Sequence, residues 1–257
     1  MAAGIDYREY PPAAPLRPYV SCLWSMVGSG ADPQTHRVLP DGCVDILCRS
    51  PGIGRAPTLE VVGTMTRSLE VSMDPAAEIV AVRFLPGGAF PFLGLPLHEL
   101  TDGTATLGEF WSISELSEGL HREPATRGRV RVLEHALLRR LGAGLRSVDP
   151  VIRDVLARLV RRPADASIRE WSDRAGISRQ HLTRRVREYT GVGPKELARV
   201  LRLQGVLDLV SRGGAESPQA RGWAFAAVSA GYFDQSHLIA EFRSLAGTTP
   251  ARFLAER

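Results

Sequence analysis

The C-terminal part of the sequence contains the same turn and helix twice. The first copy reads AGISRQHLTRRVR from residue 175, and the second reads AGYFDQSHLIAEFR from residue 230. The copies align with one residue inserted in the second turn, and the match continues through Gly191 with Gly247 and Pro194 with Pro250. Repeated Gly, Pro and apolar positions over this length predict an internal duplication of one supersecondary unit.

Each copy has the features of a helix-turn-helix unit. Gly176 permits the turn, and the Ser178 side chain can accept a hydrogen bond from a free backbone N–H at the start of the helix. Leu182 and Val186 form a narrow apolar seam, while most other side chains are Arg, Gln or Thr. Such a helix can present polar side chains to the major groove of DNA; a solvated surface helix is the simpler alternative.

The two units, joined by a helix and each followed by a Gly-x-x-Pro segment, resemble the DNA-binding domain of AraC/XylS-family transcriptional regulators over about residues 150–257. The resemblance implies an all-α double helix-turn-helix domain. It implies base contacts by Gln180, Thr183 and Arg184 in the first unit, and by Gln235, Ser236, Ile239 and Ala240 in the second. The full set of expected DNA-binding residues is Ser178, Arg179, Gln180, Thr183, Arg184, Arg185, Arg187, Gln235, Ser236, His237, Ile239, Ala240 and Arg243.

Periodicity and turn residues predict the helices of this domain. We expect a first helix at 151–160, scaffold helices at 167–174 and 223–230, and reading helices (those that enter the groove) at 178–189 and 233 or 234 to 245. A long helix at 194–211 joins the units, a polar loop covers 212–222, and 250–257 closes the domain. His181 and His237 occupy equivalent positions and are expected to pack on the scaffold helix or to bind a phosphate.

The two reading helices differ in their outward residues. The first carries Arg184 where the second carries Ala240. Arg binds guanine through two acceptors at once, whereas Ala can only contact a thymine methyl group. Asp234 and Glu241 of the second helix are expected to face phosphates unfavourably. We therefore predict that the first helix supplies most of the base discrimination.

Charge is distributed unevenly along the chain. Residues 1–149 contain 14 Arg against 17 Asp plus Glu, a net charge of −3, and residues 150–257 contain 18 Lys plus Arg against 11 acids, a net charge of +7. Basic charge gathered in one half indicates a polyanionic partner. No apolar run approaches the ~18 residues that a membrane span needs, so we expect no membrane association.

The N-terminal half has short β-patterned runs separated by turn residues. After a Pro-rich extended arm at 1–18, strands are expected at 19–27, 36–39, 43–48, 59–65, 69–73 and 78–85, with a short helix in 89–95. Strands at this spacing predict a small barrel or sandwich. The fold class is therefore α+β with two domains.

Three segments of this half, LPDGCVDIL from residue 39, VGTM from residue 62 and RFLPGG from residue 83, resemble a β-rich, cupin-like domain often found ahead of AraC-type DNA-binding domains. The resemblance covers about residues 5–112 and implies a sensing or regulatory role without naming a ligand. The expected divisions are 1–112, a helical connector and linker at 113–149, and 150–257.

The connector carries an apolar stripe of Val130, Leu133, Leu137 and Leu141. The stripe fits either intramolecular core or a seam between two subunits, so a monomer and a homodimer both remain open.

An enzyme-like alternative concerns His36, Asp41, Cys43 and Asp45. Cupin-like barrels can hold a metal on His and carboxylate ligands, but this set lacks a close His pair and Asp41 lies in a Pro-Asp-Gly turn. Some proteins with AraC-type helices transfer alkyl groups from DNA to a reactive cysteine; the acids near Cys43 would raise its pKa and oppose that chemistry.

We predict no catalytic residues, metal or cofactor, and a cytoplasmic, sequence-specific transcription regulator. Double-stranded DNA is the expected partner, with RNA polymerase and a small-molecule effector or partner protein as further candidates. Two alternatives remain: a DNA-repair or other enzyme that uses the β-rich half, with DNA binding for delivery, and an architectural DNA binder that needs no ligand.

Overall fold

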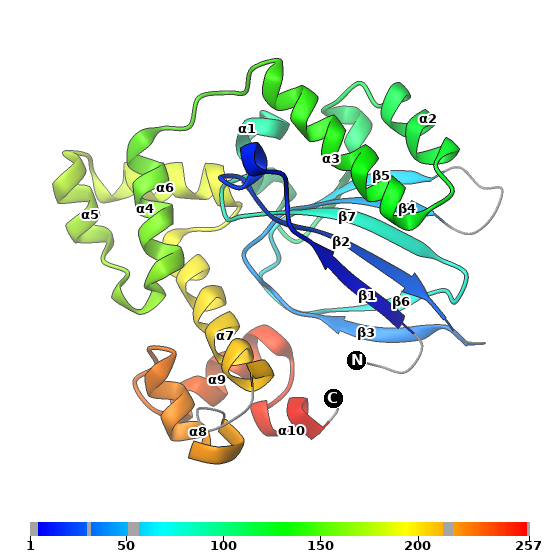
Figure 1. Ribbon diagram of the computed structural model, residues 1–257. Helices are drawn as coiled ribbons and strands as arrows, with labels where there is room; N and C mark the ends of the chain where they lie inside the picture. Colours follow the sequence, from blue (N-terminus) through cyan, green and yellow to red (C-terminus); the bar gives the residue numbers. More distant parts are fainter. Residues whose placement is uncertain (1–4, 30–31, 51–56, 213–217, 256–257) are drawn as a thin grey trace.

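The computed structural model describes residues 5–29, 32–50, 57–212 and 218–255, in a β-rich N-terminal part and a helical C-terminal part (Figure 1). The core of the predicted polar loop, 213–217, and the last two residues of the predicted terminal helix lie outside the described residues. The predicted fold class, α+β with a β-rich domain before an all-α domain, is confirmed.

Six antiparallel strands form the main sheet in the order β1-β2-β7-β4-β5-β8. The strands are β1 (Ile5–Tyr10), β2 (Val20–Gly28), β4 (Asp45–Ser50), β5 (Thr58–Val62), β7 (Glu78–Phe84) and β8 (Thr104–Thr106). A second sheet pairs β3 (Gln34–Val38) with β6 (Leu69–Met73). Within the described residues neither sheet closes on itself, because β1 and β8 are the two edges of the larger one. The barrel form of the prediction is therefore wrong.

The main sheet is buried on both faces, and alternate side chains of its strands pack against different layers. On one face, Trp24 and Leu47 share a cluster with Met73 of β6, so the two-stranded sheet covers this side. On the other face, Ile46 and Val80 pack in one cluster with the helices that follow the sheet. These are α1 (Phe90–Leu93), α2 (Ser114–Arg122) and α3 (Thr126–Gly142), together with the short turns η1 (Ala14–Leu16), η2 (Leu97–Leu100) and η3 (Leu107–Glu109).

The apolar stripe of the connector lies on α3 and faces the sheet. Val130, Leu133 and Leu137 are buried in the same cluster as the strands, and Leu141 is partly buried against it. Arg129 of α3 also pairs with Glu78 of β7. The stripe is therefore intramolecular core, and the subunit-seam interpretation is not supported.

Two strands differ from the sequence prediction. Within the predicted extended arm, Ile5–Tyr10 is a strand that pairs along its whole length with β2. The three-residue strand β8 was not predicted, since a run of three Thr and Ala residues is too short to show an alternation of polar and apolar side chains. Both are edge strands, whose formation depends on a partner that is distant in sequence.

The C-terminal part consists of helices joined by short turns. They are α4 (Pro150–Arg161), η4 (Pro163–Asp165), α5 (Ile168–Ala175), α6 (Arg179–Thr190), α7 (Pro194–Arg212), α8 (Pro218–Ser229), α9 (Gln235–Ala246) and α10 (Pro250–Ala255). The bounds agree with the prediction within about two residues, except that α8 begins earlier. Gly222, at φ 83°, interrupts the helical backbone of α8, and the predicted scaffold helix corresponds to the part after this break.

The two parts share one apolar core. Leu156 of α4, Val186 of α6 and Leu197 of α7 belong to the same buried cluster as the strands and α3. At the contact, the rings of Phe90 in α1 and Tyr189 in α6 stack with centroids 4.0 Å apart. The helical part is thus packed directly against the β-rich part.

Candidate nucleic-acid interface

The first helix-turn-helix unit consists of α5, a turn at Gly176 and α6. Gly176 ends α5 with a φ of 65°, a conformation that favours glycine. The Ser178 side chain then caps α6, because its Oγ accepts a hydrogen bond from the His181 N–H at 3.1 Å. Leu182 and Val186 are fully buried, as their spacing predicts. These features fix α6 by one side and leave its opposite side free to face a partner.

The outward side of α6 is polar and largely exposed. Arg179, Gln180, Arg184 and Arg187 are exposed, and Thr183 is half-buried. Arg184 binds Glu188 through Nη1 and Oε1 at 2.9 Å, although 64% of its side chain remains exposed. Among the described residues, Arg179 and Arg187 have no acidic partner. This side therefore offers positive charge and hydrogen-bond donors.

Arg185 lies on a different side of α6 from the other predicted contacts. Only 26% of its side chain is exposed. Its guanidinium binds Glu188 Oε2 at 2.6 Å and Tyr189 Oη at 3.1 Å, and lies 3.8 Å from Asp149 Oδ2. Arg185 thus connects the reading helix to the linker before α4 and does not join the outward group.

The second unit repeats this construction with α8, a turn at Gly231 and α9. Gly231 has a φ of 80°. Asp234 caps α9, and its Oδ1 accepts a hydrogen bond from the His237 N–H at 2.7 Å. Leu238 and Phe242 are fully buried in the positions that Leu182 and Val186 occupy in the first unit. The duplication visible in the sequence is therefore a duplication of structure.

The outward side of α9 carries shorter side chains. Gln235, Ser236, Ala240 and Arg243 are exposed, and Ile239 is half-buried. His237 is exposed too, but its Nε2 is 3.5 Å from Glu241 Oε1, on the side that faces α7. Like Arg185, it stands apart from the outward group.

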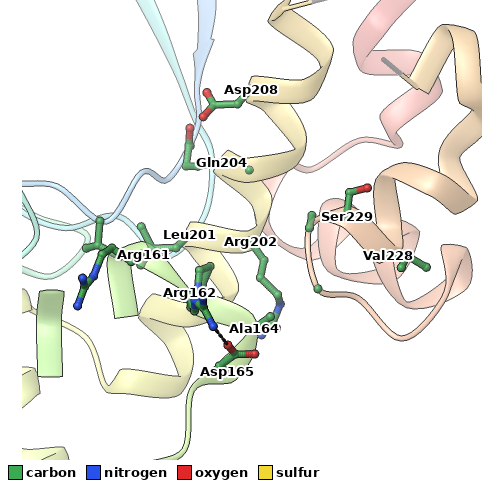
Figure 2. A pocket seen from close by; sticks show the side chains of 15 residues that line it. Arg161, Arg162, Ala164, Asp165, Leu201, Arg202, Gln204, Asp208, Val228 and Ser229 are labelled. Atoms are coloured by element: carbon green, nitrogen blue, oxygen red, sulfur yellow. Dashed lines mark ion pairs between the residues drawn. The ribbon is translucent and has the colours of Figure 1, made fainter. Parts of the chain in front are cut away.

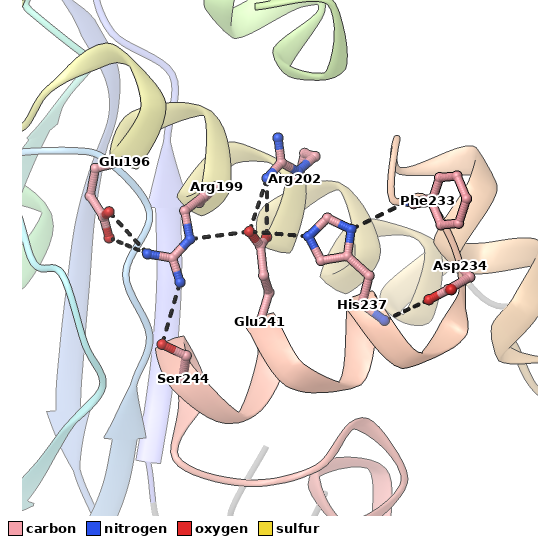
Figure 3. A network of polar contacts seen from close by, with 8 residues as sticks. All are labelled: Glu196, Arg199, Arg202, Phe233, Asp234, His237, Glu241 and Ser244. Atoms are coloured by element: carbon pink, nitrogen blue, oxygen red, sulfur yellow. Dashed lines mark hydrogen bonds and ion pairs between the residues drawn. The ribbon is translucent and has the colours of Figure 1, made fainter.

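Glu241 is the centre of a polar network between α9 and α7 (Figure 3). Its side chain is 12% exposed, and its carboxylate accepts hydrogen bonds from Arg199 Nε at 3.1 Å and Arg202 Nη2 at 3.0 Å. Arg199 also binds Glu196 on α7 itself. The expectation that Glu241 faces DNA phosphates is wrong, since the carboxylate points toward α7 and is neutralised there.

Comparisons with known proteins agree with this geometry. Residues 171–256 match a family model described as a helix-turn-helix domain. These residues form an AraC-type helix-turn-helix domain. The chain is a DNA-binding transcription regulator. Residues 8–106 match a model described as a domain of unknown function, DUF6597. No curated protein matches the chain.

Solved structures similar to the chain are distant in sequence. ToxT from Vibrio cholerae is 12% identical with a TM-score of 0.47, and 98% of each chain is covered. ToxT bound to (E)-4-(8-methylnaphthalen-1-yl)but-3-enoic acid is 13% identical with the same TM-score and coverage. The AraC-like transcriptional activator CuxR is 13% identical with a TM-score of 0.26, over 88% of this chain and 92% of its own. The family assignment therefore depends on the helix-turn-helix model and on the duplicated unit.

A groove of about 520 Å³ lies beside the turn of the second unit (Figure 2). It lies between α7, the end of α4 with η4, and the turn after α8. At this turn, a Cβ added to Gly231 would lie 2.2 Å from the Ala164 Cβ of η4. The second turn is therefore held against the segment that precedes the first unit.

The β-rich part contacts both units through one loop, residues 63–68 between β5 and β6. Thr64 Oγ1 donates to the Thr190 carbonyl at the end of α6 at 2.6 Å. The Ser68 N–H donates to the Leu245 carbonyl near the end of α9 at 2.8 Å. Asp102 braces the loop by accepting hydrogen bonds from the Thr66 N–H and Oγ1. The C-terminal ends of the two reading helices thus meet the same short segment.

The enzyme-like residues do not assemble into one site. Asp41 Oδ1 accepts a hydrogen bond from the Cys43 N–H at 2.9 Å, as a turn residue does, and Arg83 pairs with both Asp41 and Asp45. His36 lies in the second sheet, 3.3 Å from Met26 Sδ. No group of three or more His, Cys, Asp or Glu side chains in the described part of the chain could hold a metal ion.

The thiols are poorly suited to nucleophilic chemistry. Burial raises the pKa of the half-buried Cys43 well above its usual value, and Asp41 and Asp45 raise it further. Burial also raises the pKa of Cys22 and of Cys48 to about 11. Because the thiolate is the reactive form, these shifts disfavour the alkyl-transfer alternative. No helix in the described ranges is both long and apolar enough to cross a membrane.

Proposed function

We propose that this regulator reads two stretches of DNA major groove, one with α6 and one with α9. The observation that carries the proposal is the pair of capped helices whose outward sides are exposed while their inner sides are buried. The proposed base and phosphate contacts are Ser178, Arg179, Gln180, Thr183, Arg184 and Arg187 in the first unit, and Gln235, Ser236, Ile239, Ala240 and Arg243 in the second. Arg185 and His237 support these helices from the sides that face the protein.

The full chain provides the test. We expect a sequence to be enriched from a random DNA pool, and its affinity to fall with salt by a log–log slope of about −0.9 per phosphate contacted. Arg187→Ala and Arg243→Ala should each reduce the slope by about one. Arg127→Ala, an exposed change on α3, is the control and should leave the slope unchanged. The proposal fails if no sequence is enriched or if the affinity does not respond to salt.

We further propose that the β-rich domain, within residues 1–112, controls DNA binding through the loop at 63–68. This loop contacts the ends of both reading helices, so a shift of the loop would change their relative orientation. A small molecule or a partner protein bound to the β-rich domain would act by moving it. We propose that the chain acts in the cytoplasm on chromosomal DNA, as a monomer or a homodimer. RNA polymerase is the protein partner that we propose for the DNA-bound regulator.

The loop can be tested without knowing the effector. Ser68→Pro removes the N–H that binds Leu245, while Ser68→Ala keeps it and is the matched control. We expect Ser68→Pro to broaden the preferred spacing between the two DNA half-sites, with the preferred bases in each half-site unchanged. An unaltered spacing preference in Ser68→Pro would contradict the control role of the loop.

A further inference from the structure

Phe233 is the one residue of the second turn that has no counterpart in the first. Tyr232 is buried at the place that Ile177 occupies, and Asp234 caps α9 as Ser178 caps α6. The inserted residue between them is therefore Phe233. Its side chain is 88% exposed, although a phenyl ring is among the side chains that gain most from burial.

The ring lies at the end of the unit that approaches DNA. Figure 3 shows Phe233 beside Asp234 at the start of α9, where its backbone N–H donates to Nδ1 of His237 at 3.4 Å. Gln235 and Ser236, which are both exposed, follow Asp234 in the sequence. In helix-turn-helix proteins the N-terminal residues of the reading helix contact base edges, so an exposed ring at this position adjoins the groove.

The chemistry around the ring favours bases over phosphates. The Asp234 carboxylate sits on the N-terminal end of α9, the end whose backbone dipoles would otherwise attract a phosphate. The outward side of α9 continues with Ser236, Ile239 and Ala240, which are short or apolar. The apolar feature that the major groove presents is the methyl group of thymine.

We propose that Phe233 is a specificity-determining residue that contacts thymine methyl groups in the half-site read by α9. Ile239 and Ala240 extend this apolar surface along the helix. The first unit reads its half-site by hydrogen bonds, and the second reads methyl groups. This inference depends on the proposed DNA-reading function of α9.

The experiment uses the full chain and its selected DNA site. Base positions whose preference relaxes in Arg184→Ala belong to α6, which assigns the other half-site to α9. Each thymine of that half-site is then replaced by deoxyuridine, which lacks only the methyl group. For the wild-type chain we expect at least one replacement to weaken binding about fourfold, the effect of one apolar carbon returned to water. The Phe233→Ala variant should bind more weakly and should no longer respond to that replacement.

Two controls accompany the variant. Val228→Ala removes another exposed apolar side chain, 68% exposed on α8, and should keep both the affinity and the response to deoxyuridine. Phe233→Ala should unfold at the wild-type temperature, because the ring is almost fully exposed. The inference is overturned if Phe233→Ala binds as tightly as the wild type, or if deoxyuridine weakens both proteins equally. Failure of the proposed function would differ, since the wild-type chain would then select no sequence.

Discussion

The two helix-turn-helix units are alike in the residues that fold them and differ in the residues that contact their surroundings. Both have a glycine of positive φ in the turn, a capped reading helix and a buried pair of apolar residues four apart. The equivalent positions Arg185 and Glu241 carry opposite charges, because the first faces Asp149 and Glu188 and the second faces two arginines of α7. The two copies therefore share the turn, cap and core residues that fold each unit. The residues that contact the rest of the protein differ, because the groups that they contact differ.

The units also differ in what supports them. The end of α6 rests on the β-rich domain through Tyr189, which stacks on Phe90, and through the carbonyls of Thr190 and Gly191. The second unit depends on α7, through Glu241. Within the described residues, the β-rich part adds one backbone hydrogen bond, from the Ser68 N–H to the Leu245 carbonyl, and the packing of Leu39 against the apolar cluster of the unit. We therefore expect the β-rich domain to influence the first unit more strongly.

The charged positions of the two units should differ in their contribution to stability. Glu241→Gln leaves Arg202, 15% exposed, without an acidic partner among the described residues, and we expect a loss of about 2–3 kcal/mol in the free energy of unfolding. Arg185→Met should cost only about 1 kcal/mol, since Glu188 retains Arg184. Urea unfolding of both variants measures the difference. Equal costs would show that the two units are anchored alike.

The two turn glycines offer a second comparison. An Ala side chain at Gly176 meets nothing within 4 Å, so Gly176→Ala should cost about 1–2 kcal/mol from the positive φ alone. Gly231→Ala adds a clash with Ala164 and should cost about 1–3 kcal/mol more. Thermal unfolding of the two variants side by side tests this. If the Gly231→Ala protein is as stable as the Gly176→Ala protein, η4 can move away from the added methyl group at little cost in free energy.

The outward faces should differ in base discrimination. We expect Arg184→Ala to weaken binding by about 1–3 kcal/mol and to relax the preference at one base position. Ala240→Gly, at the equivalent position of α9, should do little beyond loosening its helix by about 1 kcal/mol. Base-by-base affinity measurements over both half-sites provide the readout. Equal information in the two half-sites would contradict our ranking of the first unit above the second.

The smallest effect concerns the two caps. Ser178→Ala and Asp234→Ala each leave one backbone N–H without its partner and should lower the unfolding free energy by about 1 kcal/mol. Asp234→Ser keeps a cap but removes the negative charge, and should make DNA binding more sensitive to salt by admitting a phosphate at the helix end. An unchanged salt slope in Asp234→Ser would indicate that the end of α9 stays away from the backbone.

Sequence patterns predicted the elements that depend on near neighbours along the chain. The cap at Ser178, the seam of Leu182 and Val186, and the strand over residues 69–73 all follow from a few consecutive residues. The insertion that leaves Phe233 exposed was also visible, as the change of spacing between the two copies. What the pattern did not reveal was that the phenyl ring stays exposed in the folded protein.

The sequence by itself therefore determined the duplicated unit, its turn and cap residues, the basic C-terminal half and the order of most strands and helices. Only the tertiary structure decided that the sheets stay open, that the stripe of α3 covers a sheet, and that Arg185 and Glu241 face the protein. The reason is physical: caps, turns and periodicity act within about one or two turns of the chain. The partner of a buried side chain is set instead by packing between elements far apart in sequence, as when one loop meets the ends of both reading helices.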